Sequence, residues 1–117
     1  MCTPLRFSRY ATGKGAGEAL VGETEATLAS QWKLTTRTDG SYNIICRADG
    51  TFVSPNSANN TALRTVADEP SAGWSISPAA TLGYYIITSG TAQFNQTNNA
   101  SLNWNVYNWG GGTNTAD

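Results

Sequence analysis

The sequence contains no histidine and few charged residues. Its 117 residues include seven Lys and Arg against eight Asp and Glu, which makes 13% charged residues and a formal net charge of −1. Soluble proteins average roughly 25% charged residues. Without histidine the commonest general acid–base group is missing. Without clustered Lys and Arg there is no electrostatic footprint for nucleic acid. We therefore expect no enzyme and no nucleic-acid partner.

Other catalytic and metal-binding patterns are also missing. Glu18, Glu23 and Glu25 lie close together, but in a loop they indicate a solvated run of charge rather than the facing carboxyl pair of a glycosidase. No Cys/His/Asp cluster has the spacing of metal ligands. The sequence predicts no metal site and no cofactor.

Long apolar runs and a cysteine framework are absent as well. No stretch is long enough to span a membrane, and the first residues lack the apolar core of a signal peptide. Cys2 and Cys46 are the only cysteines. A buried free Cys46 with an unpaired Cys2 is the preferred interpretation, and a Cys2–Cys46 bridge stays open because it depends on geometry.

A repeated stretch dominates what is present. Trp, Tyr, Ile-Ile and Phe recur at one spacing, from Trp32, Tyr42, Ile44, Ile45 and Phe52 to Trp74, Tyr84, Ile86, Ile87 and Phe94. Each residue moves by the same 42 positions. A repeat of this length is typical of stacked or symmetric architectures, whose units cannot bury their apolar faces alone. We expect a single domain, 1–117, with repeats at about 1–31, 32–73 and 74–117.

Short alternating segments bounded by turn residues indicate an all-β fold with no helix. We expect about eleven strands, of which the clearest are 4–11, 19–23, 31–37, 42–47, 51–54, 62–66, 74–77, 84–88, 92–95 and 101–108. Asp39-Gly40 and Asp49-Gly50 predict tight turns between them. A closed barrel removes the exposed edges that so many short strands create.

The segments SQWKL, SYNIICRADGTFV and LNWNVYNWGGG resemble a known family. With the 42-residue step, they are similar to the ricin B-chain-like β-trefoils, notably modules appended to secreted glycosidases of Bacteroidetes. The resemblance implies a β-trefoil of three pseudo-repeats, a lectin-like function and an extracellular location. It places a sugar-binding Asp at Asp49 and a stacking aromatic at Trp104. No repeat carries both residues, so a structural or protein-interaction trefoil is the alternative.

The densest group of sugar-binding residue types lies near the end of the chain. Aromatic rings suit the C–H face of a sugar, and amides and carboxylates suit its hydroxyls. The predicted carbohydrate-binding residues are Asp49, Asn103, Trp104, Asn105, Tyr107 and Trp109. The aromatics and Asp49 have competing structural roles, because large aromatics commonly fill cores and an Asp before Gly commonly forms a turn. Trp32 and Trp74 we assign to the core.

The repeat also predicts an incomplete barrel. A third copy of the strand that begins at Trp32 and Trp74 would fall at position 116, and the sequence ends at Asp117. We therefore expect eleven strands of a twelve-strand plan, with the closing strand missing and an open edge on strand 4–11. An open edge is a template for another chain. The expected partner is a glycan, a neighbouring catalytic domain or a second copy is the alternative partner, and no membrane contact is expected.

Overall fold

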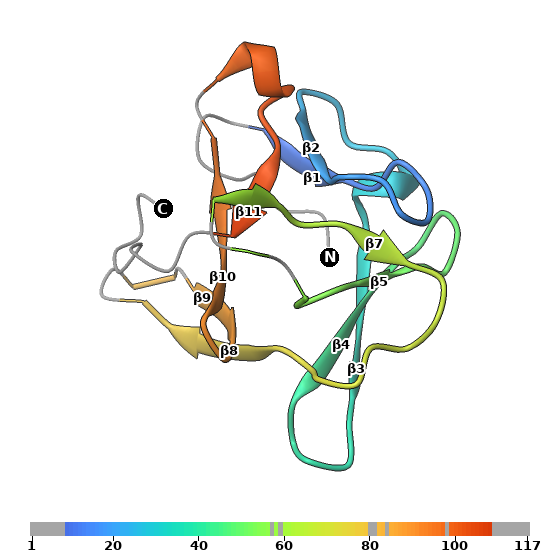
Figure 1. Cartoon of the computed structure of the whole chain (residues 1–117), viewed down its shortest axis with the longest axis vertical. Coiled ribbons are helices and arrows are strands. Elements are labelled where there is room, and N and C mark those ends of the chain that lie inside the picture. Colours follow the sequence, from blue (N-terminus) through green and yellow to red (C-terminus); the bar gives the residue numbers. More distant parts are fainter. Residues whose placement is uncertain are drawn as a thin grey trace.

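The computed structural model describes residues 9–56, 58, 60–79, 82–83, 85–97 and 99–108, and this part of the chain is all-β. It contains two short 3-10 turns, η2 (Leu28–Ser30) and η3 (Ala100–Leu102), and no α-helix. The strands are β1 (Tyr10–Thr12), β2 (Val21–Glu23), β3 (Trp32–Thr36), β4 (Tyr42–Cys46), β5 (Phe52–Val53), β6 (Thr61–Ala62), β7 (Thr65–Val66), β8 (Ser75–Pro78), β9 (Tyr85–Ser89), β10 (Ala92–Gln96) and β11 (Val106–Asn108) (Figure 1).

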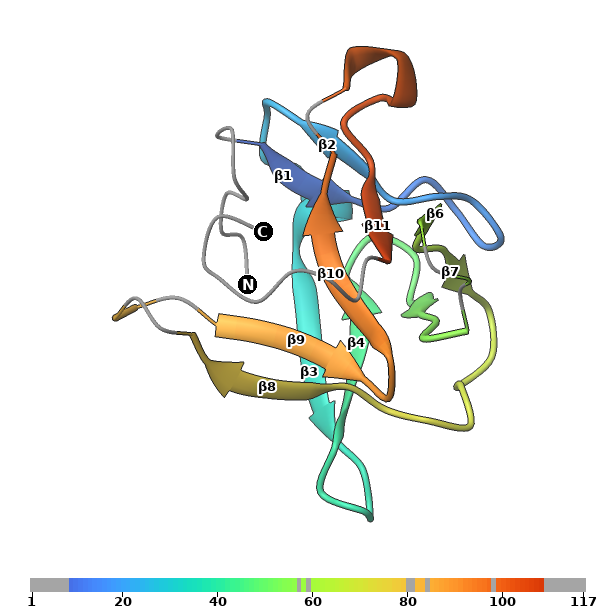
Figure 2. The same cartoon turned by 60° about the vertical axis from the view of Figure 1, so that its left-hand side comes forward.

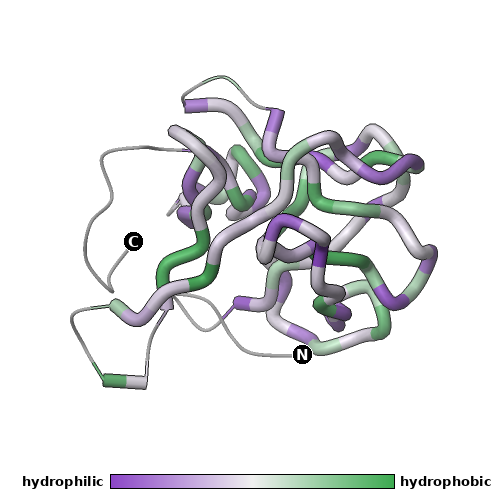
Figure 3. The backbone as a smooth tube through the Cα atoms, turned by 90° about the horizontal axis from the view of Figure 1, so that it is seen from below, coloured by the Kyte–Doolittle hydropathy of each residue, from purple (hydrophilic) through white to green (hydrophobic). Residues whose placement is uncertain are grey.

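The strands form three antiparallel sheets. Their orders are β1-β2, β3-β4-β5-β7 and β6-β11-β10-β9-β8. The β3–β4 and β8–β9 hairpins extend away from the middle of the molecule, and β10 and β11 rise beside β1 and β2 (Figure 2). Hydrophobic and hydrophilic residues are interspersed along the backbone, and several of the outer turns are hydrophilic (Figure 3).

Three segments from different thirds of the chain meet in a closed ring of backbone hydrogen bonds. Leu20 N–H donates to Leu63 O at 2.9 Å, Leu63 N–H to Val106 O at 2.9 Å, and Val106 N–H back to Leu20 O at 3.1 Å. These residues are 0%, 0% and 1% exposed. Each lies 43 positions from the next. The ring satisfies one donor and one acceptor of each residue at the centre of the core, where an unpaired backbone group would be costly.

The same step of 43 recurs three residues before each member of the ring. Gly17, Asn60 and Asn103 have φ values of 83°, 62° and 53°. Only glycine adopts this left-handed conformation freely, and Asn is among the side-chain residues that tolerate it best. The three loops that enter the ring therefore share one left-handed residue at the same position, and each has a residue type that suits it.

The two repeated tryptophans occupy matching positions. The Trp32 indole N–H donates to Ala11 O and the Trp74 indole N–H donates to Val53 O, both at 3.0 Å and both across 21 residues. Trp74 is 1% exposed and packs edge-on against Phe94, with ring centroids 4.9 Å apart, while Trp32 is half-buried. The step of 42 therefore holds for the tryptophans.

The uniform step is wrong for the isoleucines. Leu34 faces Ile44 in the β3–β4 hairpin, and Ile76 faces Ile87 in the β8–β9 hairpin. Ile44 therefore corresponds to Ile87, 43 positions later, rather than to Ile86. The reason is loop length, because residues 37–41 join the first hairpin and residues 79–84, one more, join the second.

The match of Phe52 with Phe94 is wrong for a related reason. Cys46 N–H bonds Thr51 O around a four-residue turn, 47–50, whereas Ser89 faces Ala92 around only two residues. The shorter turn moves Phe94 into the position of Val53. Both of those side chains pack in the central core, whose buried members are Leu20, Ile44, Val53, Leu63, Trp74, Ala92 and Val106.

The strand expected at 101–108 is also corrected. Residues 100–102 form η3, Asn103 and Trp104 are left-handed, and only Val106–Asn108 is a strand. The expected strand 62–66 is interrupted at Leu63 and Arg64, between β6 and β7. Residues 4–8 and 109–117 lie outside the described residues, so the closing strand and the full edge of strand 4–11 remain predictions.

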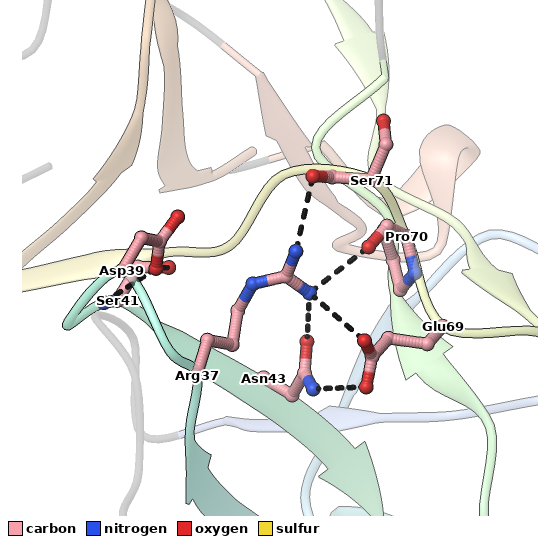
Figure 4. A network of polar contacts seen from close by, with 7 residues as sticks. All are labelled: Arg37, Asp39, Ser41, Asn43, Glu69, Pro70 and Ser71. Carbon is pink, nitrogen blue, oxygen red and sulfur yellow. Dashed lines mark hydrogen bonds and ion pairs between the residues drawn. The ribbon is translucent and has the colours of Figure 1, made fainter.

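A half-buried arginine, Arg37, connects the β3–β4 hairpin to the segment that leads into β8. Arg37 donates from Nη1 to Asn43 Oδ1 and Pro70 O, both at 2.9 Å, and from Nη2 to Ser71 O at 3.0 Å (Figure 4). Glu69 completes the network, with one carboxylate oxygen 3.6 Å from Arg37 Nη1 and the other accepting from Asn43 Nδ2 at 3.0 Å. We refer to these residues, Arg37, Asn43, Glu69, Pro70 and Ser71, as the Arg37 clamp.

Candidate functional site

A pocket of about 380 Å³ opens where β1 and β2 meet the loop that precedes β11. This volume lies at the small end of the range for ligand sites, roughly 300–1,000 Å³. The lining combines an indole, an amide, three charged groups and small apolar groups. The lining residues are Arg9, Lys14, Val21, Gly22, Glu23, Ala100, Asn103 and Trp104. We call this the Trp104 pocket.

Gly22 is the point at which β2 touches the opposite wall. Its N–H donates to Asn103 O at 3.2 Å, and its carbonyl accepts from Arg9 Nη1 at 3.2 Å. A Cβ at this position would lie 2.5 Å from both Trp104 O and Gln96 Nε2. Glycine is therefore required for the close approach of the two backbones that shape the pocket.

Trp104 has an unusual backbone conformation. Its φ is 51°, which is a genuine outlier for a bulky residue. Glu18 and Thr61, the residues that follow the equivalent left-handed positions, do not have positive φ. Strained residues cost on the order of 1–3 kcal/mol each and cluster at ligand sites. The strain at Trp104 belongs to the third loop alone.

The third loop is built differently from the other two. Glu18 N–H bonds Gly15 O at 3.1 Å and Thr61 N–H bonds Ala58 O at 3.3 Å, whereas Trp104 N–H reaches back to Asn99 O at 3.2 Å. Asn99 Oδ1 also caps η3, accepting from Ser101 N at 3.0 Å and Ser101 Oγ at 2.7 Å. The extra turn of η3 carries Trp104 to the pocket wall.

Charged groups surround the indole. The Arg9 guanidinium carbon lies 4.3 Å from the centroid of the Trp104 ring, within the range of a cation–π contact. Lys14 and Glu23 form an ion pair whose side chains are 46% and 38% exposed. A pair this exposed contributes little to stability. Its groups are therefore available to a ligand at small energetic cost.

Two buried amide oxygens near the third loop have no hydrogen-bond partner among the described residues. They are Gln96 Oε1 and Asn105 Oδ1. The nitrogen of the same amide, Gln96 Nε2, lies 3.5 Å from Trp104 O and close to Gly22. Buried acceptors of this kind are usually satisfied by water or by a ligand.

The structure brings together only part of the predicted sugar site. Asn103 and Trp104 line the pocket, while Asp49, Asn105 and Tyr107 do not. Tyr107 lies on β11, opposite Asn95 and Ala62. Trp109 lies outside the described residues.

Asp49 has a local structural role. Its Oδ1 accepts from Thr51 N–H at 3.1 Å and from the Thr51 hydroxyl at 2.7 Å, and these bonds span Gly50 at the end of the turn. The bond from the Thr51 hydroxyl is the main reason that the pKa of Asp49 lies below its ordinary value of 3.8. The competing interpretation of Asp49 as a turn residue describes what it does in this structure.

Sequence reasoning missed five of the lining residues that matter most for the shape and charge of the pocket. They are Arg9, Lys14, Val21, Gly22 and Glu23. They lie 80 or more positions before Asn103 and Trp104, and no local pattern connects the two groups. Glu23 was interpreted only as part of a solvated run of charge. The one available signal was the repeat itself, which places the first and third loops beside each other around the ring.

Other site types find little support in the described part of the chain. No group of three His, Cys, Asp or Glu side chains there could hold a metal ion. No helix there is long and apolar enough to cross a membrane. Cys46 is a buried free thiol, and its burial raises its pKa, which disfavours the reactive thiolate. Cys2 lies outside the described residues.

Comparison of the chain with protein families, with curated proteins and with solved structures finds no match.

Proposed function

We propose that this chain is a β-trefoil and serves as a non-catalytic, lectin-like carbohydrate-binding module of a secreted protein. The fold assignment is supported by the hydrogen-bond ring through Leu20, Leu63 and Val106 and by the left-handed residues at the same spacing. Three segments that meet at a common centre, each preceded by a left-handed residue at the same spacing, fit a threefold repeat. The low charge and the many Thr, Ser and Asn side chains suit a surface that binds by hydrogen bonds.

The observation that carries the sugar-binding proposal is the strained Trp104 at the wall of a polar pocket. Sugar recognition combines an aromatic surface with a few fixed donors and acceptors in a concave site. Trp104 supplies the indole, Asn103 an amide, Glu23 an acceptor and Lys14 a donor. The strain is confined to the loop that carries the indole, which fits a conformation maintained for binding rather than for folding.

Substitution of Trp104 tests this proposal. We expect Trp104→Asn to fold, because Asn tolerates the left-handed conformation, and to lose at least roughly tenfold in glycan affinity, which is 1.4 kcal/mol. The matched control is Tyr85→Asn, which removes another aromatic ring that is 65% exposed. Calorimetric titration against a panel of soluble polysaccharides is the measurement. Equal affinities of the two variants, or no glycan bound at millimolar sugar, would overturn the proposal.

A second candidate is a structural or protein-interaction trefoil. Leu82 and Tyr85, at the outer end of the β8–β9 hairpin, are 98% and 65% exposed. Exposed apolar side chains that lie together can mark a surface that another protein covers. Under this alternative Tyr85→Asn would disturb association with a neighbouring domain or a second copy, and Trp104→Asn would have no effect on it.

A further inference from the structure

Among the described residues that line the Trp104 pocket, positive charges outnumber negative charges. Three of its lining residues are charged, namely Arg9, Lys14 and Glu23. Lys14 and Glu23 pair with each other, which leaves the Arg9 guanidinium without a carboxylate partner among the described residues. The net formal charge of the lining is therefore +1, in a chain whose overall charge is −1.

Within the part of the chain that the structure describes, Arg9 makes two contacts, and these leave most of its N–H donors unused. One N–H of Nη1 donates to Gly22 O at 3.2 Å, and the guanidinium rests on the Trp104 ring. A guanidinium has five N–H donors in a planar fork, a shape that matches carboxylate and sulfate oxygens. The indole and the β2 backbone thus fix an anion-binding group at the wall of the pocket.

We infer that the glycan bound in the Trp104 pocket is acidic, with a carboxylate or sulfate group that Arg9 binds. This rests on the proposed function and names the class of sugar that the same site takes. The Trp104 ring contacts the Arg9 guanidinium and holds it in position. The indole therefore contributes to ligand binding partly by orienting Arg9. Lys14 supplies a second donor, and Glu23 accepts from a sugar hydroxyl.

The preference for an acidic sugar follows because a neutral sugar would leave the Arg9 guanidinium without a charged partner. Filling the pocket removes water from a half-buried guanidinium. A charge that loses water without gaining a partner is penalised, whereas an anionic group restores its interactions. Sites built around a fixed polar group reject ligands that lack the matching group more strongly than apolar pockets reject a change of size.

Pairs of polysaccharides that differ mainly in their negative charge test the inference. The probes are polygalacturonate and its methyl ester, alginate and its propylene glycol ester, and dextran sulfate and dextran, titrated by calorimetry at two salt concentrations. We expect at least one acidic member to bind roughly tenfold or more tightly than its neutral counterpart, with affinity falling as salt rises. The carboxylate and sulfate pairs separate the two sources of negative charge.

Variants of Arg9 assign the preference to the pocket. Arg9→Gln should abolish the difference between acidic and neutral probes. Arg9→Lys, which keeps the charge and loses the fork, should retain a weaker preference and serves if the first variant folds poorly. Lys33→Gln, which removes an exposed cation on β3, is the control and should change nothing.

The outcomes distinguish this inference from the proposed function. If neutral members bind as tightly as acidic ones, and Trp104→Asn still removes binding, the acidic preference is wrong and the sugar site stands. If acidic polysaccharides bind Arg9→Gln as tightly as the wild type, or lose as much affinity for Lys33→Gln, their binding reflects general electrostatic attraction. The inference then fails. If no probe binds at all, both fail.

Discussion

At the scale of single residues, Gly22 is the position where the pocket tolerates least change. Gly22→Ala would place a Cβ 2.5 Å from Trp104 O, and main-chain atoms cannot move aside cheaply. We expect a loss of about 1–3 kcal/mol in the free energy of unfolding, as for other overpacked sites. Urea unfolding of the variant and the wild type measures this difference.

The matched control for this prediction is Gly13→Ala. Its nearest neighbour is the Cys46 sulfur at 3.1 Å, which is a side-chain atom and can shift. If Gly13→Ala costs as much as Gly22→Ala, the close approach of β2 to the third loop is not as described.

Asp49 gives a prediction about pH. The bond from the Thr51 hydroxyl lowers the pKa of Asp49 in the folded state. A carboxyl with a lowered folded pKa contributes stability above its unfolded pKa, and that contribution is lost as the pH falls through the folded pKa. The wild-type protein should therefore exceed Asp49→Asn in stability at pH 6, and the difference should shrink below about pH 4. Urea unfolding at pH 6, 4.5 and 3 measures it, and a difference that stays constant down to pH 3 would contradict it.

At the scale of elements, the Arg37 clamp reinforces the backbone bridge between Tyr42 and Trp74 that joins the β3–β4 hairpin to the segment leading into β8. Arg37 is 14% exposed in its side chain and bonds Asn43, Pro70 and Ser71. Arg37→Met should leave these acceptors unpaired and lower the free energy of unfolding by about 2–4 kcal/mol. Lys33→Met, on the same strand but exposed, should stay within about 0.5 kcal/mol of the wild type. Similar losses in both variants would argue against the clamp.

The elements also show which features the sequence could predict. The all-β class and most strands followed from alternation and turn residues, and the tryptophan step was correct because an indole bond fixes it in both copies. The Ile and Phe matches failed because hairpin loops changed length by one or two residues. A repeat identified only from side-chain types cannot show that one loop has become longer while the next has become shorter.

The candidate site was predicted only in part, for a physical reason. Asn103 and Trp104 are neighbours in sequence and could be recognised as a pair. Arg9 and Gly22 reach them through the ring of Leu20, Leu63 and Val106, which is a tertiary contact. The left-handed turn at Trp104 also breaks the strand pattern that the alternation of 101–108 indicated.

At the scale of the whole molecule, the ring should be the most stable part of the fold. The amides of Leu20, Leu63 and Val106 are buried and bonded across three segments. We expect them to exchange with solvent only through global unfolding, at rates within roughly tenfold of one another, while the Trp104 amide exchanges faster from its loop. Hydrogen exchange followed by NMR measures this. Widely different rates in the ring would mean that the three segments do not unfold together.

The central claim is that the Trp104 pocket binds a glycan, and the most direct test maps the bound surface. The measurement is an NMR titration of the labelled protein with the tightest-binding saccharide of the panel. The account predicts saturable shifts centred on the amides of Gly22 and Asn103 and on the Trp104 indole, with no comparable change at Asp49 or Tyr85. Shifts centred on Asp49 or on the β8–β9 hairpin, or no shifts at millimolar sugar, would contradict it.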